Sequence, residues 1–380
     1  MRAWPGLPEL AGDVTADACV VGLGASGLAA IAALVQRGLS VIGVDRGRVA
    51  ASAAGRNGGL LLAGGAPFLH QAIAAWGVDA AVGLYRATLI ELDQLAAELG
   101  PSVVRRAGSI RLAGLPGPAL DEAEAADRAA EWADCAAHAD ALRAHGIAVE
   151  DYDGELGRGL FLSDDAAMNP ARRALVVAGR LRLAADLYER TTVTAVRPGA
   201  VVTAHGTVSA GIVIVAVDGQ LERLLPQLRG RVRTARLQML QTAPVARPVS
   251  CPVYGRWGYD YAQSDAAGRL YVGGGRDRFV AAEWAAHPSD SSTPTAGVQS
   301  YIEALATRMA GEPVSVEQRW AAPVAYTGDR RAVVAAVDDS VLACGGYSGT
   351  GNLVGPIAAR AAVALAVDGV PVPDYFGSGG

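Results

Sequence analysis

The stretch "ADACVVGLGASGLAAIAALVQRGLSVIGVDRG", residues 17–48, decides the fold class. It begins with a continuously apolar segment, 18–21, of the kind that forms a strand covered on both faces. A glycine-rich turn follows, then an alanine-rich segment that predicts a helix to about Arg37, and then a second strand over 40–44 that ends on Asp45. This order of elements indicates the βαβ unit of a Rossmann-like α/β domain.

The glycine turn has the spacing Gly22-x-Gly24-x-x-Gly27. Gly22 permits a tight turn, Gly24 lets backbone approach a pyrophosphate at the helix N-terminus, and Gly27 permits close packing of helix on strand. Asp45 is placed to bind ribose hydroxyls. The pattern predicts dinucleotide binding and is shared by NAD and FAD proteins.

A second glycine-rich segment, "ASAAGRNGGLLLAGG" (51–65), comes just past Asp45. In a nicotinamide-dependent enzyme another helix and strand would normally follow at this point. The long flexible excursion instead favours an extended cofactor that lies along it.

The C-terminal stretch "ACGGYSGTGN" (343–352) is also rich in glycine. An ordinary connection from a last strand to a last helix does not need Gly345, Gly346, Gly349 and Gly351 so close together. Without side chains, the backbone N–H groups of this loop can approach a ligand. We therefore expect the loop to belong to the binding site.

Composition excludes several function classes. The 380 residues carry 33 basic and 38 acidic side chains, a net charge of −5, and no basic stripe, so we expect no nucleic-acid partner. All 33 basic side chains are arginine, and the chain has no lysine. The first residues have no apolar region of the kind found in secretory signal peptides, and no apolar run of about eighteen residues occurs, so we expect no signal peptide or membrane span and a cytoplasmic protein without membrane contact.

The four cysteines are Cys19, Cys135, Cys251 and Cys344. They have no CxxC spacing, which indicates neither a metal site nor a redox pair. We expect four buried thiols and no bound metal.

The rest of the chain predicts a second region with its own sheet. Residues 67–99 and 119–145 predict two helices, with His138 and His145 as solvated helix residues. Residues 231–284 alternate apolar and polar side chains, as strands with one solvated or ligand-facing side do.

The order of motifs resembles one family over nearly the whole chain, roughly residues 17–370. After GxGxxG and the acid come "GRNGG", "MNPARR", a hairpin, "IVIVAVDG", "GRLYVGGG", "RWAAPVAYTGDRR" and "GGYSGTGN". This series is similar to the D-amino-acid oxidase, glycine oxidase and sarcosine oxidase superfamily of flavoproteins. Within it, "AGRNGG", "GRLYVGGG" and the run from Trp320 to Arg330 are most similar to the branch of γ-glutamylputrescine oxidoreductases.

The resemblance implies a Rossmann-like FAD-binding domain of the glutathione-reductase type, interleaved with an antiparallel-sheet substrate domain. It assigns residues 1–75, 150–230 and 318–372 to the FAD-binding domain. The substrate domain would comprise residues 76–149 and 231–317.

The resemblance also implies which residues contact FAD. In this family the C-terminal glycine loop passes against the flavin, and the N-terminus of the next helix, with roughly half a positive charge, favours the reduced ring. The expected FAD-binding residues are Gly22, Gly24, Ala25, Ser26, Gly27, Asp45, Arg46, Ser52, Arg56, Asn57, Gly58, Gly59, Val193, Gly219, Gly345, Gly346, Ser348, Gly349, Thr350 and Gly351. For Arg56 the competing interpretation is a surface ion pair with Asp45. Many family members have histidine where Thr350 stands, so the local proton chemistry does not carry over.

The candidate catalytic residues are three aromatic side chains that could wall a substrate pocket, Tyr347, Tyr261 and Trp320, and one acid/base, His70. Tyr259 is a further candidate for the wall. Ordinary core packing is the competing interpretation for each aromatic residue.

The family chemistry implies hydride transfer from the α-carbon of a small primary or secondary amine to flavin N5, giving an imine. One alternative is an amino-acid oxidase or dehydrogenase, or an enzyme of a specialised pathway that oxidises another C–N bond. A second alternative is a flavoprotein that binds FAD for assembly or sensing. The partners expected for the first interpretation are an amine and either O₂ or another electron acceptor.

Three departures from the family pattern refine these expectations. Ala322 stands where sarcosine oxidases have the cysteine that attaches to flavin, so we expect non-covalent FAD. The lysine that speeds the reaction with oxygen is missing, which leaves Arg56 or Arg276 as substitutes. Val324 stands where glycine oxidase has the arginine that grips the substrate carboxylate, so we expect an amine without a neighbouring carboxylate. Arg236, Arg256 and Arg319 are the alternative carboxylate ligands.

Overall fold

A computed structural model describes residues 4–284 and 291–377 of the chain. The chain divides into two compact units, each built from separated segments. Unit 1 comprises Met1–Arg56, Asn169–Ala235 and Pro323–Gly380, and unit 2 comprises Asn57–Met168 and Arg236–Ala322. Residues 57–75 and 150–168, expected within the FAD-binding domain, lie in unit 2.

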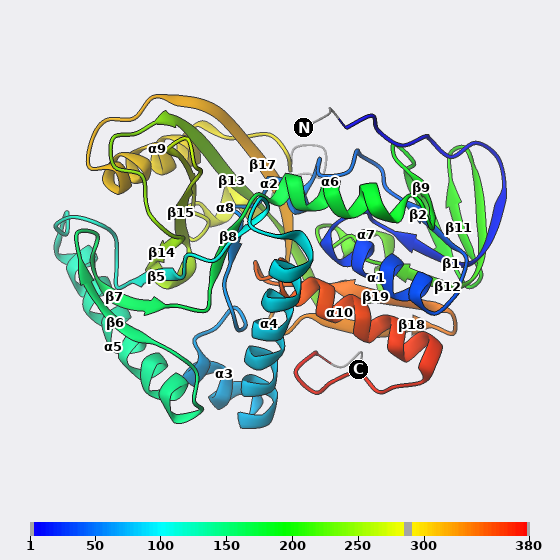
Figure 1. Ribbon diagram of the computed structural model, residues 1–380, viewed down its shortest axis with the longest axis horizontal. Coiled ribbons are helices and arrows are strands. Elements are labelled where there is room, and N and C mark those ends of the chain that lie inside the picture. Colours follow the sequence, from blue (N-terminus) through cyan, green and yellow to red (C-terminus); the bar gives the residue numbers. More distant parts are fainter. Residues whose placement is uncertain (1–3, 285–290, 378–380) are drawn as a thin grey trace. The chain divides into compact units, whose positions relative to one another are not determined.

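Unit 1 is built on an eight-stranded sheet (Figure 1). Its strands are β1 (Val14–Val21), β2 (Val41–Val44), β9 (Asp186–Tyr188), β10 (Val193–Arg197), β11 (Ala200–Thr203), β12 (Gly206–Val215), β18 (Val333–Asp338) and β19 (Val341–Gly345). Its helices are α1 (Ala25–Gln36), α2 (Ala53–Arg56), α6 (Pro170–Leu181), α7 (Leu221–Leu224) and α10 (Val354–Val363), with short helical turns η1 (Pro226–Leu228) and η3 (Ala364–Asp368). The β1–α1–β2 unit predicted from the sequence is confirmed.

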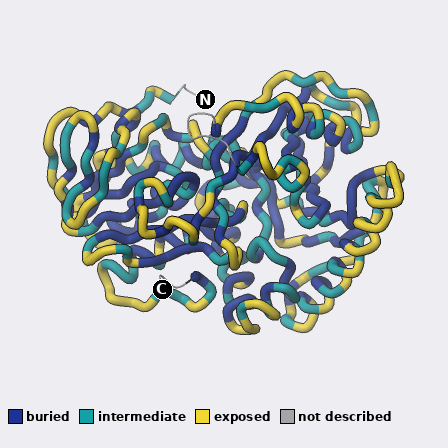
Figure 2. Tube along the Cα trace, turned by 180° about the vertical axis from the view of Figure 1, so that it is seen from behind, coloured by how far each residue is buried: buried dark blue, intermediate teal, exposed yellow. Residues whose placement is uncertain are grey.

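The centre of this sheet is parallel. β1 pairs in parallel with β2 and β12, β2 with β9, and β12 with β19. The last four residues of β1 and all of β2 and β19 are buried, which explains their continuous apolar sequences. The buried interior of each unit is the dark blue tube in Figure 2. β10, β11 and β12 form an antiparallel meander that includes the predicted hairpin.

Asn169 and Pro170 begin helix α6, as the sequence predicts. The Asn169 side chain accepts a hydrogen bond from the backbone N–H of Arg172 at 2.9 Å, and Pro170 occupies the first helical position. Both are standard signals for a helix start.

Unit 2 contains most of a second eight-stranded sheet and a small three-stranded one, β3-β8-β4. The large sheet has the order β17-β13-β16-β15-β14-β5-β7-β6. Its strands are β5 (Ser109–Leu112), β6 (Glu150–Gly154), β7 (Gly157–Leu162), β13 (Val232–Pro244), β14 (Val253–Gly255), β15 (Asp260–Ser264), β16 (Arg269–Gly273) and β17 (Val316–Thr327). The small sheet consists of β3 (Leu60–Leu61), β4 (Val104–Arg105) and β8 (Ala166–Met168).

The large sheet is antiparallel at most pairings, and β14 with β5 is a parallel pair. One face packs against helix α9 (Ala296–Ala310) through alternate apolar residues such as Ile110, Val253, Ala262 and Val272. The opposite face carries polar and aromatic side chains, as the alternation in the sequence predicts.

Helices α3 (Leu69–Trp76), α4 (Val78–Leu99) and α5 (Glu122–Ala144), with the short α8 (Val280–Trp284) and η2 (Arg256–Gly258), complete unit 2. The single helix expected over 67–99 was wrong, because Gly77 with φ +84° separates α3 from α4. The prediction that His138 is solvated was also wrong. Its side chain is 3% exposed, and its Nδ1 accepts the backbone N–H of Leu69 at 2.9 Å.

Candidate functional site

The predicted dinucleotide-binding turns gather at one edge of the unit 1 sheet. Since β2, β1, β12 and β19 are parallel neighbours, their carboxyl ends meet at the same edge. The segments that follow these ends are the first glycine turn, Asp45, the 216–219 turn and the C-terminal glycine loop. Ligands of open α/β sheets bind at this edge.

The three glycines of the first turn have different structural reasons. A Cβ on Gly22, with φ +105°, would lie 2.7 Å from the carbonyl oxygen of Ala216. A Cβ on Gly27 would overlap the carbonyl oxygen of Gly22, so close packing within the protein requires both. Gly24 differs, because its nearest neighbour would be the Cβ of Ala54 at 3.5 Å, an ordinary contact. The protein itself therefore leaves Gly24 free to carry a side chain.

Helix α1 begins at this turn without a side-chain cap. Gly24 is its N-cap, and Ala25 and Ser26 form its first turn. Uncapped N–H groups at a helix start form a site for an anion such as a pyrophosphate. Asp45 stands beside it, accepting the backbone N–H groups of Leu23 and Gly47 at 2.8 Å each, and burial raises its pKa.

The C-terminal glycine loop is tied to the end of β12 by Asp218. This partly buried carboxylate accepts the backbone N–H groups of Gly346 at 3.0 Å, Tyr347 at 3.2 Å and Ala325 at 3.2 Å. Burial raises the pKa of Asp218 to about 6 despite these three donors. Gly346 has φ +68°, a backbone conformation that favours glycine.

The other glycines of this loop are also required for more than one structural reason. A Cβ on Gly345 would lie 2.7 Å from the Leu221 side chain, and one on Gly351 would lie 2.9 Å from the Tyr347 ring. At Gly349 the nearest atom would be the Tyr326 hydroxyl at 4.0 Å. Gly349 is exposed and has φ +94°.

Tyr347 lies inside unit 1, with 5% of its surface exposed. A Cβ on Gly355 would lie 2.6 Å from Ser26 Oγ and 3.5 Å from the Tyr347 ring, so this ring sits where the starts of α1 and α10 approach each other. Burial raises its pKa well above the usual range, so the phenol stays protonated. Its hydroxyl is buried without a well-formed hydrogen bond among the described residues. This is the position of a core side chain beside the helix starts.

These features fit a bound dinucleotide. Helix α10 begins at Val354, also without a side-chain cap, next to the uncapped α1. The protein leaves room for a Cβ at Gly24, while Gly349 is exposed and has a backbone conformation that favours glycine. Together they form a polar cradle of backbone N–H groups at the sheet edge.

The remaining expected cofactor residues lie in several places. In unit 1, Arg46 donates to Gln220 at 2.9 Å, Ser52 precedes α2, Arg56 ends α2, and Val193 begins β10. Position 219 requires glycine, since a Cβ there would lie 2.7 Å from the carbonyl oxygen of Pro323. Ser348 and Thr350 close the glycine loop through hydrogen bonds to Ala325 and Tyr347, respectively.

Asn57, Gly58 and Gly59 belong to unit 2. The Asn57 side chain accepts the backbone N–H of Gly59 at 2.8 Å, and a Cβ on Gly58 would lie 3.1 Å from the Tyr261 ring. Gln263 donates to the carbonyl oxygen of Gly58. This loop therefore rests on strand β15.

The structure brings two of the predicted aromatic residues to one face of the unit 2 sheet. Tyr261 is paired with Gly273, and Tyr271 lies two residues from Gly273 on the same strand, so both tyrosines project from the same face. Trp320 meets Tyr271 edge-on, with 6.5 Å between ring centroids. The face is the one opposite helix α9.

His70 lies apart from this aromatic group. It is on α3, and its Nε2 lies 3.3 Å from Oδ1 of Asp134 on α5. Asp134 also accepts the Trp257 indole N–H at 2.7 Å. The contacts of His70 are those of a helix-to-helix pair.

The three alternative carboxylate ligands are already paired with acids in unit 2. Arg236 contacts Glu283 at 2.9 Å, Arg256 contacts Asp260 at 2.8 Å, and Arg319 contacts Glu303. None of these guanidinium groups is left without an acid partner.

The sequence reasoning missed Asp218, Glu131 and Arg111. Asp218 ends an apolar strand, a position that could have suggested a role at the sheet edge. Glu131 is 1% exposed, and its two oxygens accept the backbone N–H groups of Gly114 and Trp257. Arg111 is a charged residue within the otherwise buried strand "SIRL", and this break in the pattern was the signal that could have identified it.

Comparison with known proteins decides the family. The family described as FAD dependent oxidoreductase (DAO) matches residues 17–365 of this chain. The chain belongs to the FAD-dependent oxidoreductase family. Its cofactor is FAD, and the polar cradle at the sheet edge of unit 1 has the properties that this cofactor requires.

This FAD-dependent oxidoreductase is similar to a curated protein and to several solved structures. It is 25% identical over 373 residues to the γ-glutamylputrescine oxidoreductase of Escherichia coli (strain K12), covering 92% of this chain and 83% of that one. Among solved structures, glycine oxidase from Geobacillus kaustophilus superposes with a TM-score of 0.71 at 18% identity, over 94% and 95% of the two chains. An L-amino acid deaminase from Proteus vulgaris gives 0.72 at 18% identity, over 100% and 97%.

The described part of this oxidoreductase contains no group of three or more His, Cys, Asp or Glu side chains arranged to hold a metal ion. The cysteines are all buried and unpaired, as expected. No described helix has the length and apolar character needed to cross a bilayer.

Proposed function

We propose that this protein is an amine oxidoreductase whose substrate has no carboxylate beside the reacting nitrogen. Unit 1 is proposed to bind FAD as a glutathione-reductase-type domain. Unit 2 is proposed to be the interleaved substrate domain. Bound FAD would supply the acceptor for the hydride of the C–H bond next to the amine nitrogen.

The observation that carries this proposal is that the candidate arginines already form ion pairs with acids of the protein. An α-amino acid needs a cation for its carboxylate, since a buried carboxylate without a partner is strongly disfavoured. Val324 stands at the sequence position of the glycine-oxidase arginine, and Arg236, Arg256 and Arg319 are each occupied by an acid. An amine without an α-carboxylate makes no such demand.

The side chains of unit 2 would bind and orient this amine. The face that carries Tyr261, Tyr271 and Trp320 offers aromatic walls, which exclude water and favour the neutral form of the amine. No strong base is required, because a neutral amine already has its lone pair available. Loss of the hydride and of a nitrogen proton gives an imine, and water hydrolyses it.

The test is anaerobic reduction of the bound flavin. We expect small primary or secondary amines to bleach the yellow protein, while glycine, D-alanine and D-proline leave it oxidised at millimolar concentration. Efficient reduction by an α-amino acid, abolished by replacing Arg236, Arg256 or Arg319, would replace this proposal with an amino-acid oxidase. A hydrogen peroxide assay then separates oxidase from dehydrogenase.

A further inference from the structure

Four side-chain positions form a continuous row across the unit 2 sheet. The strand register pairs Arg111 with Tyr254, Tyr254 with Tyr261, and Tyr261 with Gly273. Directly paired residues project to the same face, so the row crosses β5, β14, β15 and β16 on the face opposite α9.

The Tyr261 end of the row adjoins the predicted cofactor loop. A Cβ on Gly58 would lie 3.1 Å from the Tyr261 ring, and one on Gly273 would lie 2.6 Å from the Tyr261 hydroxyl. The two glycines therefore make room for this tyrosine. The reacting amine is best placed here, next to the glycine segment.

Arg111 is held rigidly at the other end. Its Nε donates to the Tyr254 hydroxyl at 3.1 Å. The guanidinium lies over the Tyr254 ring at 4.4 Å and over the Phe68 ring at 4.3 Å from the ring centroids. Stacking between two aromatic rings fixes the orientation of the fork and leaves its outer edge free.

The outer nitrogens of Arg111 have no acceptor among the residues that the structure describes. Neither Nη1 nor Nη2 makes a hydrogen bond to them, and none of their carboxylates lies within ion-pair distance, although Arg111 is only partly exposed. A half-buried cation in this condition is costly unless a partner arrives.

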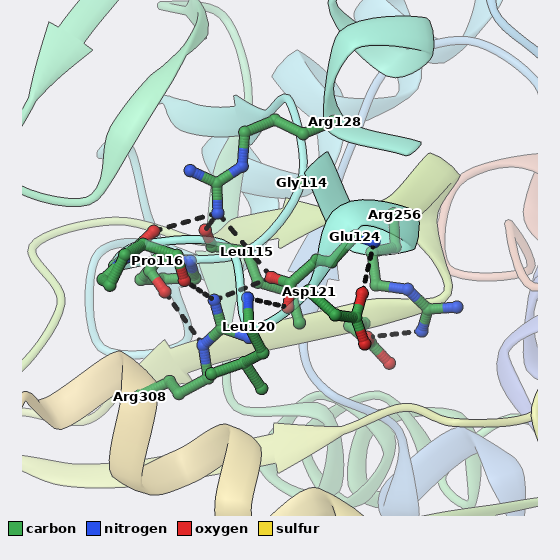
Figure 3. Close-up of polar contacts among 12 residues, drawn as sticks. Gly114, Leu115, Pro116, Leu120, Asp121, Glu124, Arg128, Arg256 and Arg308 are labelled. Carbon is green, nitrogen blue, oxygen red and sulfur yellow. Dashed lines mark hydrogen bonds and ion pairs between the residues drawn. The ribbon is translucent and has the colours of Figure 1, made fainter. Parts of the chain in front are cut away.

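Neighbouring arginines in unit 2 show the contrast (Figure 3). Arg128 donates to the carbonyl oxygens of Leu115 at 3.0 Å and Gly117 at 2.9 Å. Arg308 donates to the carbonyl oxygen of Pro116 at 2.9 Å and to Glu124 at 2.8 Å. These two side chains hold the loop after β5 through hydrogen bonds within the protein.

Two acids that interact electrostatically with Arg111, Glu131 and Asp165, are hydrogen-bonded to other groups. Glu131 accepts two backbone N–H groups, and Asp165 accepts Ser109 Oγ at 2.6 Å and the backbone N–H of Ala63 at 2.8 Å. They lower the cost of the Arg111 charge at a distance without occupying its outer edge.

We propose that Arg111 binds a carboxylate at the far end of the amine substrate. Two strand spacings separate β5 from β15, which places Arg111 roughly 10 Å from Tyr261 along the row. The substrate class is then an amine that carries a carboxylate several carbon atoms from the reacting nitrogen. This inference rests on the proposed amine oxidoreductase function and specifies its substrate.

The test compares 5-aminopentanoate with its neutral isostere 5-aminopentanamide on the FAD-loaded enzyme. Wild type should show a KM for the carboxylate at least about 30-fold lower, which corresponds to about 2 kcal/mol. Arg111→Gln should remove this preference by raising the KM for the carboxylate towards that for the amide. Arg158→Gln is the matched control, since this exposed arginine also stacks on an aromatic ring, Trp132, at 3.7 Å but lies outside the row.

Calorimetric titration of the same enzymes with pentanoate, which has no amine, gives a readout independent of turnover. We expect heat of binding in wild type and Arg158→Gln and none in Arg111→Gln. If Arg111→Gln does not fold, Arg111→Lys keeps the charge but loses the fork and should weaken pentanoate binding. Equal KM values for the two wild-type substrates, or no binding of pentanoate to wild type, overturn the proposal.

The two proposals can fail separately. If amino acids rather than amines reduce the flavin, the amine function fails. Pentanoate binding that depends on Arg111 would then still support a carboxylate site at this position.

Discussion

Oδ1 of Asp218 accepts a hydrogen bond from the backbone N–H of Gly346 at 3.0 Å. This bond joins the end of β12 to a loop 128 residues later in the chain. The same carboxylate also accepts hydrogen bonds from the backbone N–H groups of Tyr347 and Ala325, so one side chain fixes the start of the C-terminal glycine loop.

Asp218→Ala should therefore lower the free energy of unfolding by about 3 kcal/mol, because buried N–H groups lose their acceptor. It should also weaken FAD binding. Denaturant unfolding of the FAD-free protein measures the first effect and fluorescence titration with FAD the second. Asp17→Ala is the control, since this exposed aspartate also accepts a backbone N–H, that of Ser40 at 2.8 Å, and should cost clearly less stability than Asp218→Ala. Equal losses in both variants would contradict the special role of Asp218.

Gly24→Ala should separate cofactor binding from folding. The protein leaves room for a Cβ there, so the FAD-free protein should lose less than about 1 kcal/mol of stability. The Kd for FAD should rise at least about tenfold, or about 1.4 kcal/mol, because the new methyl group obstructs the pyrophosphate. Gly211→Ala, where the nearest atom to a Cβ would be 3.6 Å away, is the matched control and should leave the Kd unchanged. An unchanged Kd in Gly24→Ala would argue against pyrophosphate binding at this turn.

Glu131 should make stability depend on pH. Burial raises its pKa from 4.5 to about 7 in the folded protein. Since the folded state holds the proton more tightly, the stabilising contribution is complete below the unfolded pKa of about 4.5 and is lost as the pH rises towards 7. Between pH 5 and 6.5, Glu131→Gln should flatten the decline of unfolding free energy by about 1.4 kcal/mol per pH unit.

Urea unfolding at four pH values measures the slope for Glu131→Gln. Glu122→Gln, at an exposed position in the first turn of the same helix, serves as control and should leave the slope as in wild type. A slope in Glu131→Gln equal to that of wild type would show that this carboxyl is charged in the folded state.

FAD should be released by denaturation. Ala322 has no nucleophilic atom, and all four thiols are buried, with burial raising their pKa values. After acid precipitation the yellow colour should remain in the supernatant. Colour in the pellet would demonstrate a covalent attachment.

Reaction with oxygen should depend on arginine, because the chain has no lysine. A fixed positive charge beside the flavin speeds its reoxidation. We expect the double variant Arg56→Met, Arg276→Met to slow reoxidation by air at least about tenfold in stopped-flow measurements. An unchanged reoxidation rate in the double variant would show that another group supplies the positive charge.

The sequence predicted the β1–α1–β2 unit within a few residues, because an apolar run, spaced glycines and a terminal acid are local signals. The break at Gly77 was missed, since the apolar pattern continues through it. The burial of His138 depends on α3, which packs against α5 and whose Leu69 N–H it accepts. Arg111 was missed for a similar reason: its hydrogen-bond partner Tyr254 is 143 residues away in the chain.

The position of β19 has a consequence for synthesis on the ribosome. This strand, Val341–Gly345, pairs with β12, and helix α10 follows it. A nascent chain whose β19 and α10 are still inside the ribosome exposes one edge of β12 and lacks half of the polar cradle. The cofactor should therefore bind only after residues 341–363 have left the ribosome, and chains truncated before residue 341 should remain colourless and be prone to pair through that open edge.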